Sequence, residues 1–402
     1  MNYSTIDFFN FKGFSVQKIE NTDAQVIIHL IPRRKTATCP TCKNRSKSLY
    51  ERGDLRKIKH SRYMGKQVCL SMPARRFFCA YCHDTFNERP AWIEENARTT
   101  SSFVKETVSS LTKSSFSAIS DLYSTDYHFL ANKLLALDLN NMPWPEGELS
   151  LGFDEHSFAK GKMVITVTEV RKKQLLAIPQ EYTRDAVTAY LESRLQGELS
   201  RVTELCFDLR FKQKRVVQSF FPTATTVMDK FHVLAYASSL IDQDRRVICP
   251  STGGVKFENL RRMMKVPRDR LGIRQKEYLG SVLEANPVLK VEWEIYQCLV
   301  DFYSSKNKEE ARIRLNEIKA RASTLDKYSY LRSFSGTISR LGEEILNYFD
   351  NKTTNAYTEG VHTKIKMLKR TSFGFKNVDV YIKKMMLAFI PFAVISGLFL
   401  PR

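Results

Sequence analysis

Three acidic residues lie at positions where their carboxylates could bind metal ions for phosphodiester chemistry. Asp154 ends the apolar stretch 149–153, Asp208 ends the stretch 205–207, and Glu359 opens a late segment rich in lysine. Carboxylate oxygens are the ligands that Mg²⁺ prefers in proteins. Two such ions can activate an attacking water or hydroxyl and stabilise the leaving oxygen of a phosphodiester. An acid at a strand end also serves as a turn residue, so each acid alone leaves that structural alternative open.

The elements that must position these acids follow one another as three strands, a helix, a strand, a helix and a strand. The predicted strands cover residues 149–153, 162–170, 175–179, 205–207 and 225–228, and the predicted helices cover 183–195 and 211–221. This order is that of an RNase H-like α/β core. Its first and fourth strands are neighbours, so Asp154 and Asp208 are expected to meet although they lie 54 positions apart. Asp229 ends the last strand and is the alternative to Asp208 as second metal ligand.

A segment of 129 residues separates Asp229 from Glu359. Its charged, helical stretches at 256–265, 288–303, 308–321 and 330–349 predict an all-helical insertion in the core, for DNA contact, subunit contact or packing alone. After Glu359, a helix is expected to turn its basic side chains outward, and these are Lys364, Lys366, Lys369 and Arg370. They predict a grip on a DNA backbone. A merely solvated basic helix is the alternative.

Two Cys-x-x-Cys pairs near the front of the chain predict a structural zinc site. The pairs are Cys39 with Cys42 and Cys79 with Cys82, separated by 36 residues. Four thiolates make a tetrahedral Zn²⁺ site; independent dithiol pairs or buried cysteines are the alternative, and His83 is a candidate substitute ligand. Stretches 67–73 and 75–79 predict a hairpin that leads into the second pair. Basic residues around the pairs, among them Arg75 and Arg76, predict contact with phosphates.

The predicted organisation has five parts. They are a zinc-binding DNA-binding domain (1–95), a helix-turn-helix or linker (96–145), the first part of the core (146–235), the helical insertion (236–350), and the last part of the core with the Glu359 helix and a tail (351–402). The helix-turn-helix prediction comes from helical periodicity in 101–139, with Ser117 as one cap and Thr125 or Asp126 as the next. A plain helical linker is the alternative.

The net charge of +20, from 63 basic and 43 acidic residues, argues against an enzyme of neutral metabolites. Nucleic acid is the expected partner, with an acidic membrane surface as the competitor. No membrane span is expected, because the apolar run 385–400 is shorter than about 20 residues and Pro391 interrupts it. No signal peptide is apparent, and eight cysteines with two pairs at metal spacing indicate a reducing, cytoplasmic location.

These motifs are similar to those of the ISL-three family of bacterial insertion-sequence transposases. Cys-Pro-x-Cys at 39–42 and Arg-Arg-Phe-x-Cys-x-x-Cys at 75–82 resemble the zinc-binding head of that family. Segments 154–167, 220–233 and 355–377 resemble its three catalytic blocks. The resemblance covers nearly the whole chain, from Cys39 to about Leu387.

The resemblance implies a DDE triad of Asp154, Asp208 and Glu359 that binds two catalytic Mg²⁺ ions, replaceable by Mn²⁺, with accessory roles for Asp229 and His232. It implies that Lys160 contacts DNA and that the zinc head and helix-turn-helix recognise terminal inverted repeats. Cut-and-paste transposition would require a homo-oligomer, expected to be a dimer, on double-stranded end and target DNA, near the bacterial nucleoid. The alternative function is a catalytically silent DNA-binding regulator derived from a transposase. An RNase H-like nuclease or resolvase is the rival enzyme.

Overall fold

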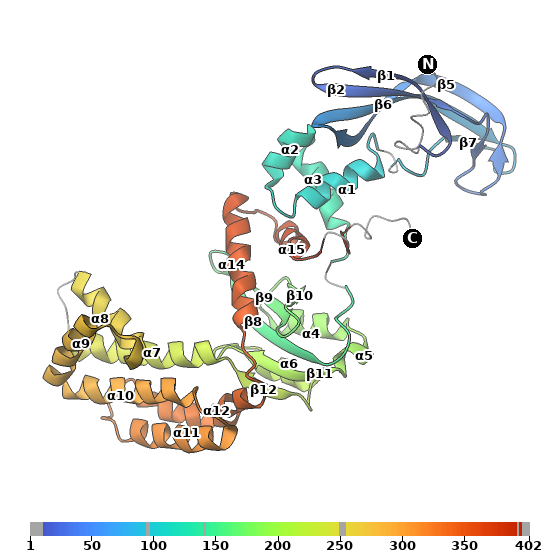
Figure 1. Ribbon diagram of the computed structural model, residues 1–402. Helices are drawn as coiled ribbons and strands as arrows, with labels where there is room; N and C mark the ends of the chain where they lie inside the picture. The colour runs from blue at the N-terminus through green and yellow to red at the C-terminus, as the bar shows by residue number, and fades with distance from the viewer. Residues whose placement is uncertain (1–10, 94–96, 140–141, 249–254, 392–393, 396–402) are drawn as a thin grey trace. The chain divides into compact units, whose positions relative to one another are not determined.

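The computed structural model describes residues 11–93, 97–139, 142–248, 255–391 and 394–395 (Figure 1). The chain divides into two compact units. The first consists of residues up to 137 together with those from 368 onward, and the second consists of residues 138–367. Each unit combines a β-sheet with helices, as a multidomain α/β chain should. The five-part division predicted from the sequence is finer than these two units and stays a prediction.

The first unit contains a five-stranded sheet in the order β1-β2-β6-β5, with β7 paired to β6. Its strands are β1 (Phe14–Asn21), β2 (Gln25–Pro32), β5 (Ser48–Tyr63), β6 (Lys66–Cys79) and β7 (Asp84–Asn87), and a separate small pair joins β3 (Ala37–Thr38) to β4 (Arg45–Ser46). The predicted hairpin within 67–79 is wrong, because β6 runs unbroken through Pro73. The sheet admits this proline where the β5–β6 register shifts, between Arg52 and Leu55. The hairpin turn lies instead at Met64 and Gly65, both with positive φ.

Helices complete the first unit. They are α1 (Ser101–Ser110), α2 (Phe116–Tyr123), α3 (Tyr127–Leu135) and α15 (Val378–Leu387). Side chains of Ser115 and Asp126 cap α2 and α3, so α2 begins slightly earlier than the predicted cap at Ser117. Lys384 of α15 is buried and donates its Nζ hydrogens to the backbone carbonyls of Leu111 and Ser114.

The apolar C-terminal run contains only a short helix in the described part. The helix α15 ends at Leu387, and the predicted tail at 392–393 and 396–402 lies outside the described residues, as does Cys249. Within the described part of the chain, no helix is long and apolar enough to cross a membrane.

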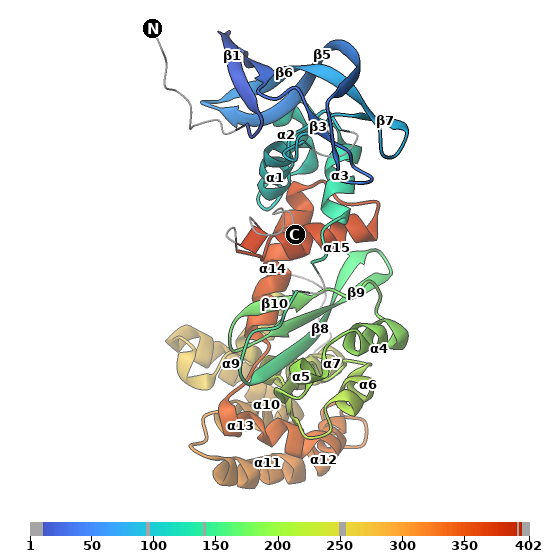
Figure 2. The same ribbon diagram turned by 90° about the vertical axis from the view of Figure 1, so that its right-hand side faces the viewer.

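The second unit is built on a five-stranded sheet in the order β10-β9-β8-β11-β12 (Figure 1; β8, β9 and β10 are also labelled in Figure 2). Its strands are β8 (Leu149–Ala159), β9 (Lys162–Glu169), β10 (Gln174–Ala177), β11 (Val202–Phe207) and β12 (Thr225–Met228). The first three strands pair antiparallel, whereas β11 is parallel to both β8 and β12. The predicted adjacency of the first and fourth strands is confirmed. The two predicted helices appear as α4 (Arg184–Glu192) and α6 (Lys214–Phe220), with the short α5 (Gln196–Leu199) after α4.

Strand register places three acids in one row. Phe207 of β11 pairs with Phe153 of β8 on one side and with Met228 of β12 on the other. The residues that follow these three partners are Asp154, Asp208 and Asp229. The row therefore comes from the backbone pairing alone. Asp154 does not end its strand as predicted, because β9 stays paired to β8 as far as Ala159.

Alternation along β8 and β9 gives the sheet two different faces. Leu151 and Phe153 of β8 and Val167 of β9 join an apolar core with Val187 of α4 and Val217 of α6. On the opposite face, residues such as Gly152, Asp154 and His156 of β8 alternate with these, since neighbouring side chains of a strand point to opposite sides. That second face is polar and receives the helix α14 (Ala356–Thr371).

A helical insertion lies between β12 and α14. Its helices are α7 (Lys230–Ile248), α8 (Val255–Lys265), α9 (Ile273–Ala285), α10 (Pro287–Phe302), α11 (Lys308–Ser323), α12 (Ser333–Leu346) and α13 (Tyr348–Asn351). All regular elements of the described residues in this segment are helical, as predicted. At the end of the insertion, the chain is hydrogen-bonded to Glu204 of β11. This buried carboxylate accepts hydrogen bonds from Asn351 (2.8 Å) and Thr353 (2.6 Å).

Gly152→Ala is expected to destabilise the second unit. A Cβ at this position would lie 2.5 Å from Oδ1 of Asn355 and 2.6 Å from Cγ1 of Val170. Such overpacking costs about 1–3 kcal/mol, and it should lower the urea midpoint of the full chain. Gly197→Ala is the matched control, because no atom lies within 4 Å of its added Cβ. A midpoint that falls equally in both variants would contradict the close-packing argument.

Glu292→Gln is expected to stabilise the insertion at alkaline pH. Burial, together with the charge and hydrogen bond of the neighbouring Asp244, raises the pKa of Glu292 to about 8. The folded chain therefore holds a proton that the unfolded chain releases from about pH 4.5, so wild-type stability falls as pH rises through this window. Glutamine mimics the protonated acid. The variant should exceed wild type by about 1 kcal/mol or more at pH 8, and the difference should fade near pH 5.

Urea midpoints at both pH values measure this effect. Glu294→Gln on the same helix is the control, because the side chain of Glu294 is half exposed in a surface ion pair with Arg321. A stability difference that is the same at both pH values would show that Glu292 is ionised in the folded protein.

Candidate functional site

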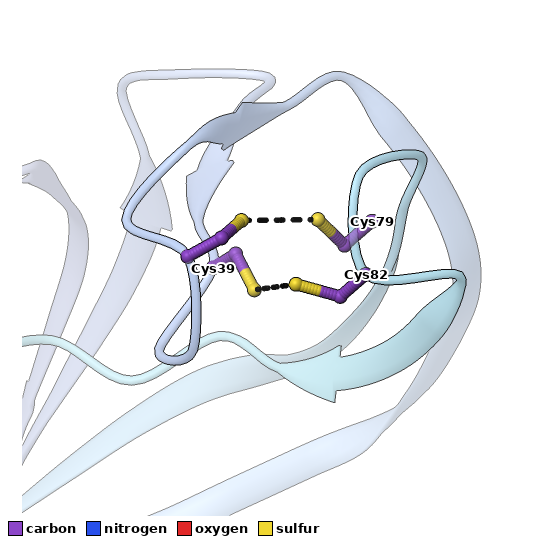
Figure 3. Close-up of side chains that lie close together, drawn as sticks. Cys39, Cys79 and Cys82 are labelled. Atoms are coloured by element: carbon purple, nitrogen blue, oxygen red, sulfur yellow. Dashed lines mark hydrogen bonds between the residues drawn. The ribbon is translucent and has the colours of Figure 1, made fainter.

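The four paired cysteines converge on one point of the first unit. The sulfur of Cys39 lies 3.8 Å from that of Cys82, and the sulfur of Cys42 lies 3.5 Å from that of Cys79 (Figure 3). All four ligand atoms lie within 4.8 Å of one another. Because each sulfur contacts one from the other pair, the two pairs are not independent. Hydrogen bonds, first from the backbone N–H of Cys42, lower the pKa of the Cys39 thiol to about 6, whereas hydrogen bonds to the other three thiols raise the pKa of Cys82 to about 12. Metal binding requires all four as thiolates.

Local turns create this cluster. Cys39 and Cys42 occupy the loop between β3 and β4, and Cys79 ends β6 just before the turn that holds Cys82. Four thiolates at this spacing fit a tetrahedral structural Zn²⁺. His83 follows with positive φ and is not one of the four clustered ligands, so the substitute-ligand alternative has no support.

Arg75 is placed differently from its prediction. Its guanidinium is buried, hydrogen-bonded to Glu88 (Nε to Oε2, 2.7 Å) and to the carbonyl oxygen of Arg34 (2.9 Å). A group with these partners cannot reach a phosphate, and its role is to join β6 to the loops that flank it. The neighbouring Arg76 points the other way, as strand alternation requires, and lies exposed over the ring of Tyr50.

In the second unit, the predicted acids lie around His232 of α7. Its Nδ1 lies 3.0 Å from Oδ2 of Asp208, and its Nε2 lies 3.8 Å from Oε1 of Glu359. Burial alone would lower the pKa of His232, but the hydrogen bond and charge of Asp208 raise it to about 9. Burial would raise the pKa of Asp208, and His232 lowers it instead. A positive charge thus sits between two carboxylates.

Asp229 is wholly buried at the start of α7. Its Oδ1 accepts the backbone N–H of Asn355 (2.9 Å), and its Oδ2 accepts that of His232 (3.3 Å). Burial raises the pKa of its carboxyl even so. Among the described residues of this unit, Asp229, His232 and Glu359 form a group of three whose possible ligand atoms all lie within 4.8 Å of one another.

Asp154 lies beside a second histidine. Its Oδ1 accepts the backbone N–H of Glu155 (2.7 Å), and its Oδ2 lies 3.4 Å from Nδ1 of His362 in α14. Burial raises the pKa of Asp154 to about 6, and the charge of Asp208 adds to that rise. The three predicted acids thus come from β8, from the end of β11 and from α14, with His232 beside Asp208 and Glu359 and His362 beside Asp154.

Sequence reasoning missed the groups that hold these acids. His362 lies three positions after Glu359, so both face the same side of α14, and this spacing was the available signal. No spacing in the sequence predicted the hydrogen bonds that Asn355 and Glu204 make. The predicted basic residues lie as expected, with Ile365 buried and Lys366 and Arg370 exposed on α14. Lys160 is exposed at the turn between β8 and β9.

Comparison with known proteins agrees with these sites. Residues 151–385 match the DDE family of ISL3 transposases, and residues 35–82 match the zinc finger of the transposases IS204, IS1001, IS1096 and IS1165. A transposase for insertion sequence element IS1001 from Bordetella parapertussis is 24% identical over 393 residues, which cover 94% of this chain and 96% of the relative. The matches thus define a transposase, an enzyme of DNA transposition. The chain belongs to the ISL3 family of insertion-sequence transposases.

Cys79→Ser is expected to remove the bound zinc, because three thiolates leave the tetrahedron incomplete. Zinc content, measured by atomic absorption, should fall from about one ion per chain to near zero. Cys69→Ser is the control, since Cys69 lies on the same strand outside the cluster. Unchanged zinc content in Cys79→Ser would remove this residue from the ligand set.

Proposed function

We propose that this transposase cleaves and joins DNA at a two-metal centre held by Asp154, Asp208 and Glu359. The observation that carries the proposal is the row of acids that directly follows the paired residues of β8, β11 and β12. The carboxylate of Glu359 in α14 faces His232, which lies beside this row. Asp229 and His232 are accessory residues in this scheme. Catalysis would then need no nucleophilic side chain of the protein.

The donor set fits magnesium. Carboxylate oxygens are the hard ligands that Mg²⁺ prefers. Among the described residues, Nε2 of His232 is buried without a hydrogen-bond partner, and it faces the carboxylate of Glu359. The protonated ring thus occupies a place where positive charge is stabilised. When bound, two Mg²⁺ ions would activate the attacking water or 3′-hydroxyl and stabilise the leaving oxygen.

Asp208 is better suited than Asp229 to be the second ligand. Each of the two carboxylates has two hydrogen-bond donors: the N–H groups of Asn355 and His232 for Asp229, and the N–H of Arg210 and the ring of His232 for Asp208. Burial separates them, because the side chain of Asp229 is fully buried, which suits an anchoring role. The side chain of Asp208 is 22% exposed and keeps one face toward solvent. We therefore assign Asp229 to holding α7 and the start of α14, and Asp208 to the metal centre.

The strand order β10-β9-β8-β11-β12, with one antiparallel half and one parallel half, supports an RNase H-like core. In the first unit, α2 and α3 are joined by three residues, which supports a helix-turn-helix. We assign recognition of terminal inverted repeats to these helices and the zinc module. Phosphate contacts are assigned to the exposed basic residues Arg76, Lys160, Lys364, Lys366 and Arg370, together with the half-buried Lys369. Two ends must be held together, so the working form is a dimer on DNA in the nucleoid-containing cytoplasm.

Cleavage and strand joining on a labelled duplex carrying the element's ends test this proposal. With Mg²⁺, Asp208→Asn should lower the cleavage rate at least about a hundredfold, since metal-bound charge stabilisation is worth several kcal/mol. Asp229→Asn is the comparison, because it retains one acceptor oxygen for Asn355 or His232. Its main effect should be a lower melting temperature.

The outcomes separate the alternatives. Equal cleavage by wild type and Asp208→Asn, with loss in Asp229→Asn, would make Asp229 the second ligand. A wild-type protein that binds the ends and never cuts them would be a DNA-binding regulator instead.

A further inference from the structure

A line of polar side chains leads away from Asp154 into the interior of the second unit. Nδ1 of His362 lies 3.4 Å from Oδ2 of Asp154, and its Nε2 lies 2.9 Å from Oγ1 of Thr166. The same hydroxyl lies 2.8 Å from Nδ1 of His156. The line joins α14 to β8 and β9, and it ends on the face opposite the apolar core.

These groups are too well buried for water to replace their partners. Thr166 is wholly buried, and His156 and His362 are 5% and 7% exposed. A buried polar group without a partner costs about 1–3 kcal/mol. This chain nevertheless buries three polar side chains in mutual contact. Apolar side chains would fill the same space without needing hydrogen-bond partners.

At the Asp154 end of this line, the direction of the hydrogen bond is fixed. An ionised carboxylate only accepts hydrogen bonds, so the nitrogen of His362 that faces Asp154 must carry the hydrogen. The hydroxyl of Thr166 has one hydrogen and can both donate and accept. It therefore satisfies both rings, whichever direction the hydrogen bonds take, and it fixes the plane of the His362 ring.

We propose that His362 is a positioning residue for the metal centre: it holds Oδ2 of Asp154 through its Nδ1–H, with Thr166 and His156 fixing the ring. This inference rests on the proposed role of Asp154 as a metal ligand. The other oxygen of Asp154 accepts the N–H of Glu155. Each oxygen of the carboxylate is thus oriented by one donor and keeps lone pairs for a cation.

Two variants of His362 separate positioning from packing. In His362→Asn the amide nitrogen can take the place of Nδ1, which keeps the donor toward Asp154 and loses the contact with Thr166. In His362→Gln the amide nitrogen can take the place of Nε2, which keeps the contact with Thr166 and loses the donor. Both variants are neutral and polar. A side chain that only fills space would make them equivalent at the metal centre.

The experiment titrates the zinc-loaded full chain with Mn²⁺ and follows the free ion by electron paramagnetic resonance. Removal of a residue that orients a metal ligand weakens affinity about 10–100-fold. His362→Gln should fall in that range, and Thr166→Val, which releases the ring, should weaken binding to a smaller extent, whereas His362→Asn should stay within about threefold of wild type. Thr166→Ser, which keeps the hydroxyl, should bind as wild type does. Melting temperatures of all variants provide the measure of packing.

Asp154→Asn tests the metal centre separately from the positioning role of His362. If Asp154→Asn binds Mn²⁺ as tightly as wild type, the proposed metal centre fails, and the role of His362 fails with it. If Asp154→Asn loses the ion while His362→Gln and His362→Asn bind it equally, the metal centre stands and the positioning role is overturned. Loss in His362→Gln and retention in His362→Asn, at similar melting temperatures, supports the proposal.

Discussion

The pairing of β11 with both of its neighbours is the constraint on which the row of acids depends. It sets Asp154, Asp208 and Asp229 at one level, and α14 then brings Glu359 to the same place. Carboxylates gathered this closely repel one another, and the raised pKa values of Asp154 and Glu359 reflect burial together with that repulsion. The positive charge of His232, which lies between Asp208 and Glu359, offsets this repulsion.

The late helix buries Val361 and Ile365, and polar contacts hold the chain where this helix begins. Glu204 binds the residues that leave the insertion, and Asp229 binds the backbone N–H of Asn355. Gly152 leaves room for the Asn355 side chain against β8, since a Cβ there would collide with it. Directional contacts of this kind fix the position of α14 along its axis, which apolar packing alone does less well.

The sequence predicted what depends on order and spacing. Strand order was enough to bring Asp154 and Asp208 together, and cysteine spacing was enough to predict the four-thiol cluster. It failed where distant partners decide. Arg75 lies in a basic stretch and is nevertheless buried, because Glu88 lies opposite it. The extension of β8 beyond Asp154 was missed because its polar residues, such as His156, face α14 and not solvent.

The helical insertion has its two ends fastened at one residue. The insertion follows directly after Asp229, and the carboxylate of Asp229 also accepts the N–H of Asn355, where the chain returns from it. A segment whose ends meet behaves as a closed cassette, and domains tolerate such segments at points where entry and exit are adjacent. The insertion can therefore lengthen, shorten or be exchanged among related elements without displacing the row of acids. The sequence of the insertion can thus diverge while the strand register that aligns the acids is conserved.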